Sequence, residues 1–575
     1  MKSIKVLLCC LSIYCSTIAF SQQNQQKVQS TFCNPLDLNY RFELEAPSRR
    51  EAADPTVIVF KDRYYLFASK SGGYWHSLDL ISWSFVETDE IPTEEYAPTV
   101  IAIRDTLFFL ASSAKKSTIY KSVDPLSGKW SVAKEQLEMA VWDPALFMDE
   151  DNRLYLYWGI MNNLKGVELD YKNDFEFIGK PQVLITYNPA SYGWEVPGDY
   201  NELIEKKPFI EGCWANKYNG KYYLQYAAPG TEYKSYSDAV YISDSPLGPY
   251  ELQSHNPFSY KPEGFINGAG HGSTFEDEWG NHWHISTMSI SVKHQFERRL
   301  GLWPAFIDED GILYAYTAFG DYPHKMPQSK MNSPKDYLLR GMLLSYNKPI
   351  EVSSTYKEFS KEKALDENIR TYWSAESGNE GEWIVVDLLD KCTINSIQIN
   401  FAEEESTILG RKQERLYHQY KLEYSNNKRN WRTMVDKTGN RTDSPHSYVE
   451  LYKPVSARYI RLTNYHVPDG KFAISDLRVF GKGAGKVPKG ETTFNVTRDK
   501  ADNRKTTISW TKKTDATGYN IRYGTHPDKL YLNYQVYDSE TITINSLNSE
   551  LDYYFTVDAF NENGITEGKQ IIKVK

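Results

Sequence analysis

The chain has 575 residues, of which 41% are hydrophobic, 25% charged and 14% aromatic. At roughly 150 residues per domain, this length predicts several domains. The aromatic content and the 34 Gly and 26 Pro, which follow no period, exclude a disordered or collagen-like chain, and the net charge of -9 disfavours nucleic acid or an anionic membrane as partner. The 43 Tyr and 14 Trp indicate either packed β-structure or surfaces that stack on sugars.

The N-terminus is typical of a secretory signal peptide, predicted over residues 1–21. Lys2 and Lys5 precede an apolar run over residues 6–19, and a small-x-small cleavage site ends at Ser21. A lipoprotein anchor at Cys15 is disfavoured because the bulky Tyr14 precedes it. We therefore expect a secreted or periplasmic protein. No later run approaches eighteen apolar residues, so no membrane span is expected.

Three cysteines remain after the predicted cleavage: Cys33, Cys213 and Cys392. Their odd number and wide spacing match neither a disulfide framework nor a metal site. We expect isolated, buried thiols. Residues 22–49, which contain the first of them, form an N-terminal segment before the first domain.

Residues 50–322 are predicted to be all-β, because short β-branched and aromatic runs alternate with turn residues. A unit recurs five times: a short motif, a strand, a polar turn and a second aromatic strand. Five such units predict a five-bladed β-propeller. The copies begin at Ala53-Asp54-Pro55, Ala97-Pro98, Trp142-Asp143-Pro144, Glu211-Gly212-Cys213 and His271-Gly272-Ser273.

In a propeller the innermost strand of every blade runs along the central channel, so the residues that start the repeats should meet at one mouth. Asp-Pro could merely begin a strand as a turn. Ala97 in the second copy shows that the turn does not require an acid, which favours a function for the acids elsewhere. The residues predicted to converge are Asp54, Ala97, Asp143, Glu211 and His271.

Carboxylates gathered in one funnel suit the hydrolysis of glycosidic bonds. That reaction needs one carboxylic acid to protonate the leaving oxygen and one carboxylate to activate water or attack carbon. Two acids in a shared cleft have different pKa values, so one of them can stay protonated near neutral pH.

On these motifs, residues 50–322 resemble glycoside hydrolase family 43, whose members are secreted five-bladed propellers that invert the anomeric configuration. The resemblance implies that Asp54 is the general base, Asp143 tunes the pKa of the acid and orients it, and Glu211 is the general acid. Inversion implies carboxyl groups roughly 6.5–9.5 Å apart. His271 matches an axial histidine that often contacts calcium or a water. One departure is Cys213, where the family often has Pro.

Further residues are candidates for binding the substrate. Trp75, Trp142 and Trp214 could stack on sugars, with core packing as the alternative for each. His271 and Arg298 could donate hydrogen bonds to the substrate, and for Arg298 and its neighbour Arg299 a solvated pair is the alternative. A calcium ion at His271, bound directly or through water, is left open, since calcium prefers oxygen ligands. No other cofactor is expected.

The remaining chain is predicted to hold two more β-domains. Residues 323–350 are a linker or wrap-around segment. Residues 351–482 resemble a discoidin (coagulation-factor type C) jelly-roll sandwich, also used as a carbohydrate-binding module, through motifs such as Thr371-Tyr372-Trp373. Residues 488–575 alternate like a β-sandwich and resemble a fibronectin type III module, with a spacer as the expected role.

The sequence thus predicts a secreted, monomeric exo-glycosidase of the arabinofuranosidase, xylosidase or galactosidase type, acting on plant-type oligo- or polysaccharides. The alternative is a glycan-binding protein with a decayed propeller, in which the discoidin-like domain carries the function. The presence of all three acids favours the enzyme. An invertase-like family 32 opening and the repeated boxes of a sialidase are both missing.

Overall fold

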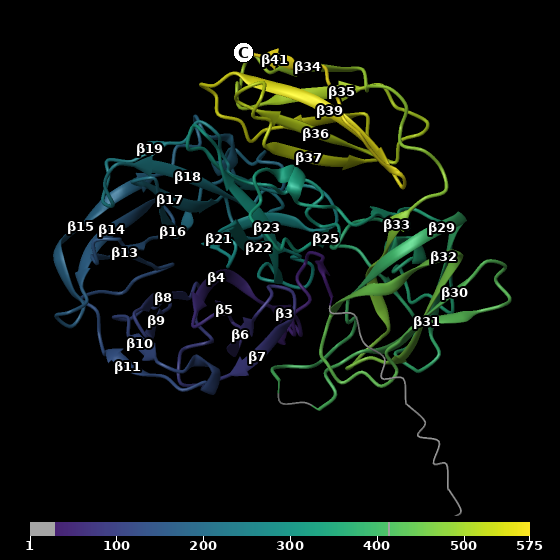
Figure 1. Cartoon of the computed structure of the whole chain (residues 1–575), viewed down its shortest axis with the longest axis horizontal. Coiled ribbons are helices and arrows are strands. Elements are labelled where there is room, and N and C mark those ends of the chain that lie inside the picture. Colours follow the sequence, from purple (N-terminus) through teal and green to yellow (C-terminus); the bar gives the residue numbers. More distant parts are fainter. Residues whose placement is uncertain (1–28, 412–413) are drawn as a thin grey trace, which may run out of the picture.

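The computed structural model describes residues 29–411 and 414–575. The predicted signal peptide lies outside them. The described residues form β-strands and four short 3-10 helices, and none of these helices is long and apolar enough to cross a membrane. Figure 1 shows three β-domains: a ring of blades (purple to teal), a second domain (green) and a C-terminal sandwich (yellow).

The ring consists of five antiparallel sheets in chain order, so the prediction of a five-bladed propeller is confirmed. Blade 1 has β4 (Ala53–Phe60), β5 (Arg63–Ser69), β6 (Gly73–Ser77) and β7 (Trp83–Glu87). Blade 2 has β8 (Thr99–Ile103), β9 (Thr106–Leu110), β10 (Ile119–Ser122), η1 (Pro125–Ser127) and β11 (Ser131–Lys134). Blade 3 has β12 (Ala145–Met148), β13 (Leu154–Trp158), β14 (Asn163–Asp170) and β15 (Glu176–Thr186).

The last two blades complete the ring. Blade 4 has η2 (Gly193–Glu195) ahead of β16 (Glu211–Tyr218), β17 (Lys221–Ala228), β18 (Ser237–Ser243), β19 (Glu251–Leu252) and β20 (Ser259–Tyr260). Blade 5 has β21 (Asn267–Glu276), β22 (His282–Ser289), β23 (Arg298–Ile307) and β24 (Leu313–Ala315). The innermost strands β4, β8, β12, β16 and β21 contact one another in a closed circle around the channel. Because blades pack on both faces, β13 is buried at every position, which explains the nearly continuous apolar runs of the sequence.

The N-terminal segment joins the first blade to the last. Its strands are β1 (Thr31–Phe32), β2 (Arg41–Phe42) and β3 (Arg50–Glu51), and β1 pairs with β25 (His324–Lys325). Phe32, Leu36, Leu38 and Tyr40 are buried in one core with Trp75 of blade 1 and Trp283 of blade 5. The segment therefore fills the seam at which the ring closes.

Residues 323–350 are a packed wrap and not a free linker. After β25 come η3 (Pro334–Asp336), β26 (Met342–Leu343) and β27 (Ile350–Val352), and both of these strands pair with the second domain. Met342 and Leu343 share a core with Cys33 and Phe319. The wrap-around interpretation thus describes this segment.

The second domain is a single curved sheet built on two long, bent strands. It contains η4 (Lys361–Ala364), β28 (Trp373–Ser374), β29 (Trp383–Phe401), β30 (Gln419–Ser425), β31 (Arg432–Asp436), β32 (His446–His466) and β33 (Ala473–Lys482). Register shifts in the pairing of β29 with β32 allow both strands to bend around one apolar core.

The C-terminal domain is a two-sheet β-sandwich. One sheet has β34 (Phe494–Arg498), β35 (Thr506–Trp510) and β38 (Thr541–Ile544). The other has β36 (Gly518–Gly524), β37 (Leu532–Tyr537), β39 (Tyr553–Asn561), β40 (Gly564–Thr566) and β41 (Ile572–Val574). Alternate residues of these strands form the core, including Trp510 and Phe555.

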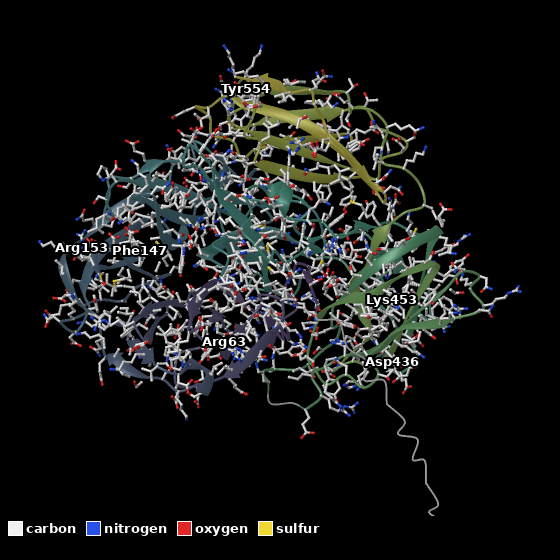
Figure 2. All side chains as sticks on the ribbon, viewed as in Figure 1. Arg63, Phe147, Arg153, Asp436, Lys453 and Tyr554 are labelled. Carbon is white, nitrogen blue, oxygen red and sulfur yellow. The ribbon has the colours of Figure 1, made fainter. Side chains whose placement is uncertain are left out.

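Figure 2 shows the side chains of all three domains, and buried ion pairs join the propeller to the second domain. Arg50 of the propeller is fully buried and pairs with Glu403 and Asp443 of the second domain at 2.8 and 2.7 Å. Removing one partner of such a buried pair would leave an uncompensated charge, so the pair specifies how the domains dock. In the described part of the chain, the three cysteines are buried and free, as predicted.

Candidate active site

Each inner strand has a left-handed residue near its start, and in four of the five blades this residue carries a side chain. Asp54, Ala97, Asp143 and His271 have φ values of 52°, 47°, 50° and 43°. Residues with a Cβ rarely adopt this backbone conformation. Because Ala97 shares it, the conformation belongs to the fold, and the chemistry belongs to the side chains placed there.

The fourth blade corrects the predicted register by one residue. Its left-handed residue is Gly212 (φ 66°), so Glu211 lies one position before the point at which the other repeats place their side chains. A Cβ on Gly212 would lie 2.7 Å from Cγ of His271. Glycine is therefore required where the backbone passes the imidazole, and Glu211 enters the funnel from the preceding position.

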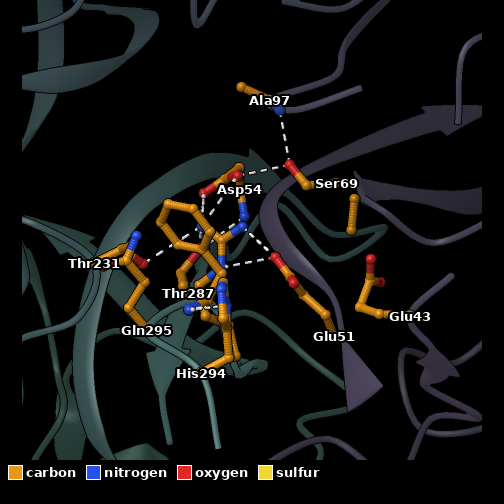
Figure 3. Close-up of polar contacts among 12 residues, drawn as sticks. Glu43, Glu51, Asp54, Ser69, Ala97, Thr231, Thr287, His294 and Gln295 are labelled. Atoms are coloured by element: carbon orange, nitrogen blue, oxygen red, sulfur yellow. Dashed lines mark hydrogen bonds and ion pairs between the residues drawn. The ribbon is translucent and has the colours of Figure 1, made fainter. Parts of the chain in front are cut away.

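Hydroxyl groups between the blades hold the starts of the inner strands in place, as Figure 3 shows around Asp54. Ser69 Oγ donates to Asp54 Oδ2 at 2.6 Å and accepts the N–H of Ala97 at 2.7 Å. Thr287 Oγ1 accepts the N–H of Asp54 at 2.8 Å, and Ser112 Oγ accepts that of Asp143 at 2.8 Å. Sequence reasoning missed these hydroxyls, although they stand near the end of the second strand of their blades.

The predicted acids and the histidine meet at this mouth of the channel. His271 Nδ1 is 3.3 Å from Asp54 Oδ1 and 3.9 Å from Asp143 Oδ2. One ligand atom each from Asp143, Glu211 and His271 lie within 4.8 Å of one another. Four residues from four blades, far apart in the sequence, therefore form one cluster.

Asp54 is held in its ionised form. Burial favours the protonated form, but the Arg298 guanidinium, at 3.3 Å from Oδ1, and the His271 imidazole outweigh it and lower the pKa of Asp54. Arg298 is itself fixed by an ion pair with Glu51, and both side chains are buried. A carboxylate in this state can accept a proton from water.

The surroundings of Glu211 favour its protonated form instead. Burial and the nearby negative charge of Asp143 raise the pKa of Glu211 to about 8. Tyr236, a fully buried residue that the sequence did not single out, donates its hydroxyl to Glu211 Oε1 at 2.5 Å. Burial also raises the pKa of Asp143. Glu211 is therefore protonated near neutral pH and can donate that proton.

His271 is fixed through its backbone. Its N–H donates to Asp238 Oδ1 at 2.7 Å, and His284 Nε2 lies 2.9 Å from the other oxygen of the same carboxylate. Burial works against a charge on His271, but the surrounding carboxylates prevail and raise its pKa. A protonated imidazole between the acids can donate hydrogen bonds.

The three candidate tryptophans lie in different places. Trp142 is 38% exposed beside Asp143, so it can meet a ligand. Trp75 is fully buried in the core between the first and last blades, with its indole N–H bonded to Asn39, which corrects its predicted role in stacking. Trp214 lines a cavity of about 490 Å³ formed by the far ends of the inner strands. That cavity is at the other mouth of the channel, so Trp214 does not border the acids.

The two arginines have separate roles. Arg298 is buried and bonds both Asp54 and Glu51, so it acts on the predicted base and is not a free substrate donor. Arg299 is also buried, and its Nε donates to Nε2 of His446 in the second domain at 2.8 Å. The solvated pair that was the alternative is therefore wrong.

The cluster does not fit a directly bound Ca²⁺. One of its three ligating groups is an imidazole, whereas Ca²⁺ is bound by oxygen ligands. The Nδ1 atom of His271 also faces Asp54.

Comparison with known families agrees with this geometry. Residues 48–319 match the model described as Glycosyl hydrolases family 43. The chain contains a family 43 glycoside hydrolase domain. Residues 349–475 match the F5/8 type C domain, which confirms the discoidin-like prediction for the second domain.

Three curated relatives are similar to parts of the chain. A beta-xylosidase of Xylanibacter ruminicola is 27% identical over 23% of this chain and 42% of its own. A beta-D-galactofuranosidase of Aspergillus niger is 26% identical over 39% of this chain and 69% of its own. An arabinoxylan arabinofuranohydrolase of Paenibacillus polymyxa is 29% identical over 41% of this chain and 45% of its own. The chain thus spans less than half the length of two of these relatives. A solved thermostable family-43 glycoside hydrolase aligns with a TM-score of 0.41 and 22% identity, over 52% of this chain and 99% of its own.

Proposed function

We propose that this protein is a secreted, inverting exo-glycosidase whose general base is Asp54 and whose general acid is Glu211. One observation carries the proposal: the surroundings of the two carboxyl groups push their pKa values in opposite directions, downward for Asp54 and to about 8 for Glu211. Such a pair supplies a base and an acid at the same pH.

In this mechanism Asp54 takes a proton from a water molecule, whose oxygen attacks the anomeric carbon. The bond from that carbon to the leaving-group oxygen breaks, and Glu211 gives its proton to this oxygen. Asp143 keeps Glu211 protonated through its negative charge. Inversion predicts that the carboxyl groups of Asp54 and Glu211 are roughly 6.5–9.5 Å apart.

The substrate we propose is a terminal arabinofuranosyl, xylosyl or galactosyl residue of a plant-type polysaccharide. The names of the three relatives, a xylosidase, an arabinofuranohydrolase and a galactofuranosidase, support this range. The exposed Trp142 beside the acids offers a surface for the sugar.

The other domains fit a glycan-degrading enzyme. We propose that the discoidin-like domain binds carbohydrate and that the C-terminal sandwich is a fibronectin type III module, which its two facing sheets support. Export by the N-terminal signal and a monomeric state remain predictions. A Ca²⁺ ion held by His271 through water also remains a prediction, tested by whether added Ca²⁺ raises the melting temperature of wild type more than that of His271→Ala.

A panel of aryl glycosides tests the activity. Wild type should hydrolyse at least one pentoside or galactoside, and Asp54→Ala and Glu211→Ala should lose most of that activity, since general acid–base catalysis contributes about 10²- to 10⁴-fold at each step. Survival of full activity in both variants would defeat the assignment. Wild type inactive on the whole panel would favour the glycan-binding alternative.

A further inference from the structure

Residues 229–236 lead to the hydrogen-bond donor of Glu211 and are bonded to residues 187–201, which precede Glu211 in the chain; together we call these two segments the acid-side wall. The second segment ends at Tyr236, the donor to Glu211 Oε1. The Tyr236 ring lies against the backbone of Gly270: a Cβ on Gly270 would be 2.7 Å from Cδ1 of Tyr236. The tyrosine therefore has little freedom once the wall is in place.

The two segments of the wall are bonded to each other. Ser235 Oγ donates to the carbonyl of Gly198 at 2.7 Å, and the N–H of Lys234 donates to Asp199 Oδ1 at 2.9 Å. The position of Tyr236, the next residue, therefore depends on where residues 198 and 199 lie.

One arginine of the discoidin-like domain spans both segments. Arg370 Nη1 donates to Asp199 Oδ2 at 2.8 Å, and its Nη2 donates to the carbonyl of Glu232 at 3.0 Å. The neighbouring Ile369 is fixed to the propeller, because its N–H donates to the carbonyl of Phe265 at 3.0 Å. The planar guanidinium thus joins the segments at a defined spacing.

The C-terminal sandwich also holds the first segment of the wall, through residues 545–549. A Cβ on Gly193 would lie 2.1 Å from the carbonyl oxygen of Asn545, so the two backbones are in close contact. The bonds are Gly193 N–H to Leu547 O at 2.9 Å, Ser549 N–H to Ser191 O at 2.9 Å, and Asn545 Nδ2 to Tyr200 O at 2.7 Å. This domain therefore touches the catalytic domain where the wall begins and is more than a spacer.

We propose that Arg370 and residues 545–549 are positioning elements for the acid: by holding the acid-side wall they keep Tyr236 on Oε1 of Glu211. With Oε1 accepting the tyrosine hydroxyl, the proton of Glu211 resides on Oε2, which is left to face the leaving-group oxygen. The role of Glu211 rests on the proposed function.

Leaving groups of different acidity separate a positioning role from a structural one. A 2,4-dinitrophenyl glycoside has a leaving group that departs without much protonation, whereas a 4-methoxyphenyl glycoside depends on the general acid. A misplaced acid therefore slows the second substrate selectively. General destabilisation slows both alike.

The test uses the full chain with Arg370→Ala, and with Arg458→Ala as a matched control. Among the residues that the structure describes, Arg458 bonds within its own domain, to Asp387 at 2.7 and 2.8 Å. We expect Arg370→Ala to lower kcat/KM about tenfold on the 4-methoxyphenyl glycoside, part of the roughly 10²- to 10⁴-fold that a general acid supplies. On the dinitrophenyl glycoside, kcat/KM should change less than about twofold. Asn545→Ala, which removes the bond to the carbonyl of Tyr200 next to Asp199, should act in the same direction, and the control variant should change neither kcat/KM value.

Hydrogen exchange provides a readout that needs no activity. Peptides covering residues 229–236 should exchange faster in Arg370→Ala than in wild type or Arg458→Ala. Exchange in Arg370→Ala that equals that of wild type would overturn the proposal. An equal loss of kcat/KM on both glycosides, at an unchanged melting temperature, would overturn it as well. A wild type that cleaves no glycoside would refute the proposed function alone, because the exchange comparison still decides whether Arg370 holds the wall.

Discussion

Replacing Asp143 with Asn should move the pH dependence of the enzyme in a defined direction. In wild type, kcat/KM requires protonated Glu211, so it should fall as pH rises through about 8. The negative charge of Asp143 contributes to this raised pKa, and its oxygen belongs to a cluster whose ligand atoms lie within 4.8 Å. Asp143→Asn removes the charge and keeps the shape of the side chain.

The size of the effect follows from that distance. Two unit charges 4.8 Å apart repel by about 3.5 kcal/mol at an effective dielectric constant near 20, which corresponds to somewhat more than two pH units. We therefore expect the alkaline limb to shift down by up to about two pH units. At pH 7 this would cost about tenfold in kcat/KM, which would largely return at pH 5, where Glu211 is protonated again.

The measurement is a profile of kcat/KM from pH 4 to 10 on any aryl glycoside that wild type cleaves. Asp174→Asn is the control, because Asp174 is an exposed residue of blade 3 that pairs with Lys134 at the surface. An alkaline limb that stays in place in Asp143→Asn, or moves to higher pH, would refute the view that Asp143 acts on Glu211 through its charge.

Three further predictions concern other residues. Arg298→Met should raise the pKa of Asp54, so the acid limb of the same profile should move to higher pH; an unmoved limb would contradict the pairing. Trp142→Ala should raise KM and leave the melting temperature unchanged, and an unchanged KM on every substrate would exclude stacking. Trp75→Ala should destabilise the fold by about 3–5 kcal/mol in urea denaturation, with the KM of the remaining folded enzyme unchanged; a raised KM would restore its predicted site role.

Much of the fold and the acids of the site were predictable, because both depend on local patterns that repeat. Each blade must bury its second strand on both faces, so runs such as residues 154–158 recur and reveal the number of blades. The repeats then place Asp54, Asp143 and His271 at one mouth, as the structure shows.

The rest depends on contacts between distant parts of the chain. Tyr236 looks like one more aromatic residue of a β-rich sequence, and only the folding of blade 4, which brings the residue before β18 to the start of β16, makes it a donor to Glu211. Trp75 looks like a stacking residue until the N-terminal segment covers it. The displacement of Glu211 by one position depends on how closely Gly212 passes His271, which no pattern along the chain reports.

The way the ring closes also sets the order in which the protein can fold. The strand β1 finds its partner β25 nearly 300 residues later in the chain. At synthesis rates of about 5–20 residues per second, β25 is made roughly 15–60 s after β1. During that time the apolar flank of the first blade is not yet covered. Pairing at such a distance makes folding slow, and it leaves the apolar surface of the unfinished ring exposed to aggregation until the fifth blade has been made.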